Sequence, residues 1–163
     1  MASGDTLLIF TPLHNEPPAS NYATIDLRNQ HPVLDFDAAT NESAVFSSVM
    51  PRNYDGGGIT VYLHYSMSSA TSGTVDWDVA FERIGDQQQD IDSDGFASAK
   101  SIDDTTVPGT SGLVDVVSLS LSHGAEIDNT AAGNEFRIKV TRDATSDTAA
   151  GDAELLAVEL KEI

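Results

Sequence analysis

The sequence predicts an all-β protein, an antiparallel two-sheet sandwich of jelly-roll type. Two observations support this: apolar residues alternate with polar ones along most of the chain, and turn-forming residues separate the alternating segments. In TVDWDVAFERI, for example, Val75, Trp77 and Phe81 fall on one face and acidic residues on the other. The segment ITVYLHYSM at 59–67 alternates in the same way. About eight or nine such segments are typical of two packed sheets.

The remaining strands are expected where shorter alternating or apolar runs occur. These runs lie at 6–10, 23–27, 32–36, 43–50, 113–121, 135–142 and 153–162. The last run has the composition of a short helix as well, but Leu156, Val158 and Leu160 alternate with other residues, which favours a strand. Val114 and Val116 are in phase opposite Val117 and Leu119, which indicates either a central strand or a subunit interface. The segment 85–111 is predicted to be a loop.

The chain divides into residues 1–21, an N-terminal arm or first strand, and a sandwich domain at 22–163. Pro17 and Pro18 favour an extended path after the apolar run at 7–10. Two interpretations follow. Either an extended arm anchors the protein to a partner, or the run is the first strand of the same sandwich, followed by a proline-rich loop.

The charge of the chain excludes some classes of function. There are 26 acidic and 8 basic residues, and the formal net charge is −18. Nucleic acid is an improbable partner, because its phosphates are bound by clustered lysine and arginine. The apolar run at 7–10 is far too short to span a membrane, so no membrane partner is expected. With no cysteine, disulfides and thiolate chemistry are excluded.

The stretch DIDSDGF at 90–96 resembles the first half of a calcium-binding loop. Asp90, Asp92, Asp94 and Gly95 occupy the expected positions, but Ser101 stands where a closing glutamate belongs. No helical pattern flanks the loop. The stretch is therefore predicted to be a solvated turn in which aspartates cap their own backbone and Gly95 supplies positive φ. A weakly held structural calcium ion is the alternative, and no other cofactor is expected.

No catalytic constellation is apparent. Four histidines, His14, His31, His64 and His123, are scattered without metal-ligand spacing, and there is no nucleophile-elbow motif. The glycine-rich loop PRNYDGGG at 51–58 lacks the lysine of a phosphate loop. It is read either as a hairpin-type connection or as a place where backbone closely approaches a partner. We expect the protein not to be an enzyme.

A resemblance narrows the expected function. The run YATIDLRNQHPVLDFDAATNESAVFSSVMPRNYDGGGITVYLHY, followed by WDVAFERIGDQQQDIDSDGF, resembles the small acidic β-proteins of tailed-bacteriophage virions. The resemblance extends from about Tyr22 to Glu162 and lies in the general character of the sequence, not in a diagnostic motif. It implies a capsid decoration, or cement, protein made in the host cytoplasm. Such a protein binds the major capsid protein on the virion exterior as a homo-oligomer, on this resemblance a trimer.

The expected partner contacts are predicted from composition, because no family motif marks them. They are Leu7, Leu8, Ile9, Phe10, Pro12, Arg52 and Tyr54. The alternative function is a tail- or head-fibre domain that binds a receptor or carbohydrate, and a sandwich-fold glycan-active enzyme ranks below it. A sugar platform would need exposed aromatic rings, for which Tyr54, Tyr62, Tyr65 and Trp77 are the candidates. Alternation places Tyr65 and Trp77 in the core, which argues against that platform.

Overall fold

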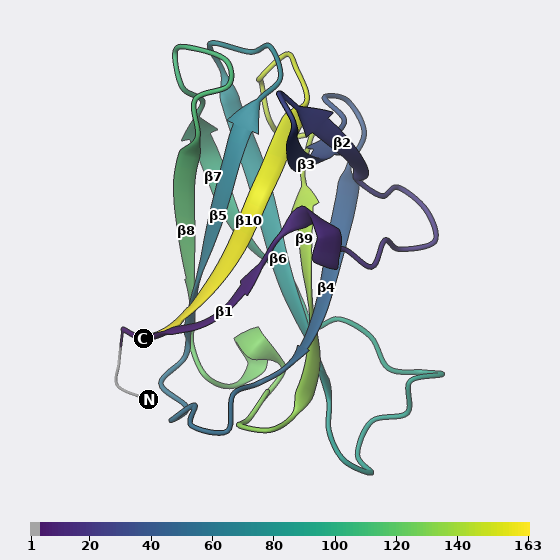
Figure 1. Ribbon diagram of the computed structural model, residues 1–163. Coiled ribbons are helices and arrows are strands. Elements are labelled where there is room, and N and C mark those ends of the chain that lie inside the picture. The colour runs from purple at the N-terminus through teal and green to yellow at the C-terminus, as the bar shows by residue number, and fades with distance from the viewer. Residues whose placement is uncertain (1–3) are drawn as a thin grey trace.

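The computed structural model describes residues 4–163 and confirms the predicted jelly-roll-like sandwich of two antiparallel sheets (Figure 1). The six-stranded sheet runs β2-β3-β10-β5-β8, and β1 also pairs with β10. Its strands are β1 (Thr6–Phe10), β2 (Thr24–Arg28), β3 (His31–Phe36), β5 (Ile59–Met67), β8 (Asp115–Leu121) and β10 (Ala153–Glu162). The four-stranded sheet runs β4-β9-β6-β7, with β4 (Glu42–Val49), β6 (Thr74–Ile84), β7 (Lys100–Thr106) and β9 (Glu135–Arg142). Two 3₁₀ turns are η1 (Pro12–His14) and η2 (Ala125–Ile127).

The core lies between the sheets and contains the aromatic residues that alternation placed there. Trp77 is fully buried on β6, and the rings of Phe36 and Tyr65 meet it edge-on at centroid distances of 5.2 and 5.5 Å. Edge-to-face contacts of this kind contribute to stability beyond the buried area alone.

Within residues 4–163, no helix has the length and apolar character needed to cross a membrane.

One strand was missed by the sequence pattern. The segment 100–106, predicted to be part of a loop, forms β7 at the edge of the four-stranded sheet and pairs with β6. Its sequence KSIDDTT offers only Ile102 to the core. The N–H of Asp104 donates to the Asp76 carboxylate at 2.7 Å, beside an irregularity in the pairing. An edge strand needs little apolar surface, which is why alternation did not predict it.

The N-terminal run is the first strand of the sandwich and not a free arm. β1 pairs with β10 through Leu8 and Leu160, and Phe10 and Val158. Figure 1 shows β1 and β10 side by side. Three of the predicted partner contacts, Leu7, Phe10 and Pro12, are therefore buried, Leu8 is half-buried against the core, and Ile9 is 58% exposed. The prediction that this whole run contacts a partner is wrong for the buried residues, because their side chains fill the protein's own core.

Candidate functional site

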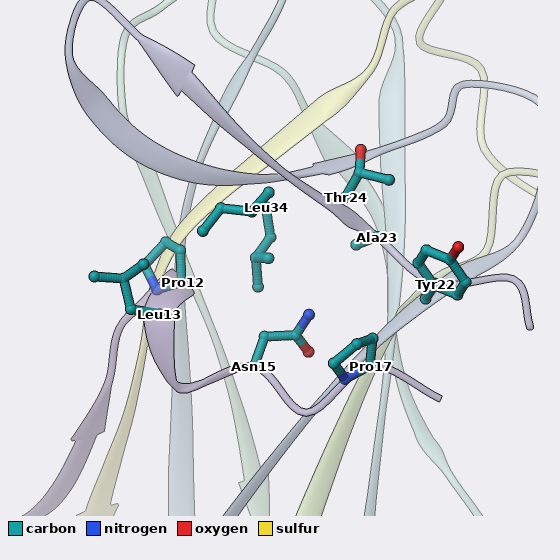
Figure 2. A pocket seen from close by; sticks show the side chains of 9 residues that line it. Pro12, Leu13, Asn15, Pro17, Tyr22, Ala23, Thr24 and Leu34 are labelled. Carbon is teal, nitrogen blue, oxygen red and sulfur yellow. The ribbon is translucent and has the colours of Figure 1, made fainter. Parts of the chain in front are cut away.

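A groove of about 370 Å³ opens where β1 ends and the β2–β3 hairpin begins. It exists because β10 is longer than either neighbour on this edge: β3 pairs with its first residues and β1 with its last. The chain between them crosses the gap as η1 and an extended segment. The groove is lined by Pro12, Leu13, Asn15, Pro17, Tyr22, Ala23, Thr24, Ile25 and Leu34. Figure 2 shows Pro12 and Leu13 on one side and Tyr22 and Pro17 on the other.

Hydrogen bonds to the backbone of one strand, β4, hold both walls of the groove. The Val45 N–H of β4 donates to Asn15 Oδ1 at 3.0 Å, and the Glu16 N–H donates to the Val45 carbonyl at 2.8 Å. On the other wall, the Ala23 N–H donates to the Ser43 carbonyl at 3.0 Å. Because β4 anchors both segments, the groove is formed before any ligand arrives, which lowers the ordering cost of binding.

The groove combines one exposed aromatic ring with one oriented amide. Tyr22 is 45% exposed and is the only Phe, Tyr or Trp exposed to this extent within residues 4–163. The bond from Val45 fixes the Asn15 oxygen, so the Asn15 amide nitrogen points into the groove (Figure 2). Leu34 and Ala23 form a buried floor. No charged residue lines the groove, in a chain with 26 acidic residues.

The second set of predicted contacts, in the loop at 51–58, splits in the same way as the first. Arg52 is exposed, but Tyr54 is buried, and its hydroxyl accepts the Gly58 N–H at 3.1 Å. The predicted partner contact at Tyr54 is wrong for this reason. The glycines allow a close approach, but to the chain itself: a Cβ at Gly57 would lie 2.7 Å from the Ile163 carbonyl, and one at Gly58 2.7 Å from that of Leu121.

The loop at 90–95 forms the predicted turn, with one correction. The Asp90 carboxylate accepts the Asp92 N–H at 3.1 Å, and the Asp90 carbonyl accepts the Asp94 N–H at 2.8 Å. Gly95 does not have a positive φ. In the wider loop at 85–99, Gln87 adopts the left-handed conformation, with φ 54°. Among the described residues, no three metal-ligating side chains converge. Calcium binding by Asp90, Asp92 and Asp94 stays a prediction.

The pKa of Asp35 lies well above the usual range of an aspartate. Burial, and to a smaller extent the neighbouring carboxylates Asp152, Glu154, Asp26 and Glu42, together raise the pKa of Asp35 on β3 from 3.8 to about 6. Its buried Oδ1 has no hydrogen-bond partner. Asp35 does not line the groove. The perturbed carboxyl is therefore not placed to act on a bound ligand.

Asp35 sets a testable pH dependence of stability. Because its pKa is higher in the folded than in the unfolded chain, its contribution to stability is fully present below about pH 4 and is lost as the pH rises through about 6. Asp35→Asn should therefore raise the unfolding free energy at pH 7 by roughly 1–2 kcal/mol, after allowance for its partial exposure. Thermal melts of both proteins between pH 4 and 7.5 check this.

Asp143 provides the control of opposite sign. Hydrogen bonds from Thr145, Ser146 and Asn41 lower its pKa to about 2, so Asp143→Asn should reduce stability at pH 7. A melting temperature of Asp35→Asn at or below that of the wild type at pH 7 would refute the assignment.

The comparisons with known proteins concern the fold. No protein-family model matches the chain, and no curated protein matches its sequence. Among solved structures, a family 35 carbohydrate-binding module from an environmental isolate is 14% identical, with a TM-score of 0.50, and the match covers 95% of this chain and 93% of that one. The xylan-binding module CBM15 is 8% identical, with a TM-score of 0.52, and the match covers 96% and 97% of the two chains. At such low identity the likeness is one of fold: the chain has the β-sandwich seen in these carbohydrate-binding modules.

Sequence reasoning missed Tyr22, the aromatic residue at the groove. The four candidates it weighed are unsuitable, because Tyr54, Tyr65 and Trp77 are buried and Tyr62 is half-buried. Tyr22 stands just before β2, outside any alternating run, next to Asn21 at a left-handed φ of 51°. The sequence feature that could have identified Tyr22 is a tyrosine next to turn-forming residues just before a strand.

Proposed function

We propose that the protein is a non-catalytic binding module and that its ligand is a glycan held in the groove beside Tyr22. The observation that carries the proposal is the pairing of an exposed aromatic ring with an oriented amide in a preformed, uncharged groove. A fold shared with carbohydrate-binding modules supports it. We extend to this chain, as part of the proposal, the binding of polysaccharide that one of those modules is named for.

The chemistry of a sugar ring suits this groove. A pyranose has an apolar C–H face and a rim of hydroxyls, so it needs a flat apolar partner and a few placed hydrogen-bonding groups. Tyr22 and Pro17 offer flat apolar surface, and the Asn15 amide donates to a hydroxyl oxygen. The absence of a lining carboxylate matches a neutral sugar better than a cationic ligand.

The proposal predicts a loss of affinity when the ring is removed. Tyr22→Ala should weaken binding of soluble xylan or β-1,4-linked oligosaccharides by about tenfold or more, because stacking contributes on the order of 1 kcal/mol beyond the buried area. Affinity electrophoresis in xylan gels, followed by titration calorimetry with a panel of oligosaccharides, measures this.

Two variants control for trivial causes. Tyr22→Phe keeps the ring and should retain most of the affinity. Ile91→Ala removes an apolar side chain that is 73% exposed on the loop at 85–99 and does not line the groove, so it should leave the affinity unchanged. If every glycan on the panel binds Tyr22→Ala as well as the wild type, the groove is not the glycan site.

A second candidate, a virion structural protein of the cement type, is favoured by a different observation. Leu13 and Ile25, which line the groove, are 73% and 56% exposed, and Leu27, two residues after Ile25 on β2, is 65% exposed. Clustered exposed apolar side chains mark protein-binding surfaces. Under this candidate the attachment to a capsid depends on Leu13 and Ile25, whereas glycan binding depends on Tyr22. The expected partner would be a major capsid protein on the exterior of a phage head.

A further inference from the structure

A second hollow adjoins the groove at η1. It has a volume of about 390 Å³ and is lined by Thr11, Pro12, Leu13, His31, Pro32 and Leu156. Pro12 and Leu13 line the groove as well, so the two hollows have one wall in common. Figure 2 shows this wall at the end of the groove opposite Tyr22. A ligand long enough to cross the wall therefore reaches both hollows.

The strand pairing of β10 explains why the second hollow exists. β3 pairs with β10 as far as Leu155 and β1 pairs with it from Val158, so Leu156 lies in the gap between the two strands. The pairing of β10 with β5 also shifts register between Leu155 and Ala157. A bulge of this kind re-aims a side chain, and half-buried Leu156 lines the hollow.

Hydrogen bonds hold the shared wall in one conformation. The Thr11 N–H donates to His14 Nδ1 at 2.9 Å, and the His14 N–H donates to the Thr11 carbonyl at 2.9 Å. Pro12 is buried within this turn, whereas Leu13 is 73% exposed. Leu13 is thus the top of a fixed ridge between the hollows. Because the ridge is already ordered, a ligand that crosses it does not bear that ordering cost.

The second hollow repeats the chemistry of the groove. No carboxylate lines either of the two, whereas three glutamates line another hollow, beside β4, β6 and β9. Pro32 and Leu13 offer apolar surface, and the imidazole of His31 can exchange hydrogen bonds with hydroxyl groups. Both His31 and Pro32 are exposed, so a ligand can reach them. The second hollow therefore suits another unit of a neutral sugar chain.

We infer that the glycan is an extended chain that occupies both hollows and crosses Leu13 between them. This inference rests on the proposed function of the groove. At about 370 and 390 Å³, each hollow is near the lower end of the range of roughly 300–1,000 Å³ for small-molecule sites, so each accommodates only a short part of a chain. Successive units of a polysaccharide present the same C–H faces and hydroxyls, which matches two neighbouring sites of like chemistry. The ligand class is a neutral oligo- or polysaccharide and not a single sugar.

Titration calorimetry with xylo- and cello-oligosaccharides, from the disaccharide to the hexasaccharide, tests the inference. His31→Ala should weaken binding of the hexasaccharide by about five- to tenfold, because only a long chain reaches the second hollow. It should leave the affinity for the shortest oligosaccharide that binds unchanged, whereas Tyr22→Ala should weaken binding of both. A longer chain also has more registers in which to bind. That statistical advantage is the same for the wild type and the variant, so it cancels in the comparison.

Two more variants keep the test decisive, and thermal melts confirm that each protein is folded. Leu156→Ala removes another side chain of the second hollow and should act as His31→Ala does. His64→Ala removes a half-buried imidazole of β5 that lines neither hollow, and it should bind every oligosaccharide as the wild type does.

The outcomes separate this inference from the proposed function. If His31→Ala and Leu156→Ala both bind the hexasaccharide as tightly as the wild type does, the inference is overturned and the glycan groove stands. If Tyr22→Ala binds every oligosaccharide as tightly as the wild type does, the proposed function fails, and this inference fails with it.

Discussion

Replacement of Arg142 by methionine is expected to cost about 3–5 kcal/mol of unfolding free energy. Arg142 is completely buried at the end of β9, where its Nε donates to Asp147 at 2.7 Å. Its other nitrogens donate to the carbonyl groups of Phe36, Ala149 and Gly151. One side chain therefore holds the loop before β10 and joins β9 of one sheet to β3 of the other. Methionine would fill the space but leave a buried carboxylate and three carbonyls without partners.

Guanidinium unfolding curves measure this loss of unfolding free energy, and two further variants test its cause. Lys100→Met removes an ion pair with Glu126 whose side chains are 43% and 36% exposed, and it should cost no more than about 1 kcal/mol. Adding Asp147→Asn to Arg142→Met should restore part of the stability, because no buried anion remains. A loss under about 1 kcal/mol for Arg142→Met would contradict the assigned role.

The second large effect is expected at Phe10. Its ring is 4% exposed and stacks on Phe46 of β4 at a centroid distance of 5.3 Å, which ties β1 to the opposite sheet. Phe10→Ser should lower the unfolding free energy by about 3 kcal/mol or more, because a large apolar side chain is removed and a hydroxyl is buried. Limited proteolysis should then cut within residues 4–16 at an increased rate, since β1 is held at its outer end only by β10.

Ile9→Ser is the matched control for Phe10→Ser. Ile9 is the adjacent residue, points to the opposite face and is 58% exposed, so its replacement should change stability by less than about 1 kcal/mol. If the two variants were equally stable, the N-terminal run would behave as a loosely attached arm, the interpretation that the structure does not support.

The alternation of apolar residues predicted the sandwich well because most strands bury one face. The segments at 59–67 and 74–84 have the expected inward residues, such as Leu63 and Phe81. β7 escaped because only Ile102 reaches the core, and an edge strand can be almost wholly polar. The burial of Arg142 could not be predicted from the sequence either, because its partners Asp147 and Gly151 lie in the turn that follows β9 and meet it only in the folded chain.

The alternation of apolar residues could not predict the groove, for a different reason. Its walls come from η1 and β2. They meet because the residues that follow η1, Asn15 and Glu16, and the residue before β2, Ala23, are hydrogen-bonded to β4, twenty to thirty residues further along the chain. Alternation describes which way side chains point within one strand. It does not say that β1 and β3 share one edge of β10 and leave a gap between them.

The sequence by itself determined the fold class, the buried face of most strands, the acidic character and the absence of cysteine chemistry, because these depend on local periodicity and composition. The tertiary structure alone decided that the N-terminal run belongs to the sandwich and that Tyr22 stands exposed in the same groove as the Asn15 amide. Each of these depends on which distant segments pair, and strand pairing is set by the packing of the whole chain.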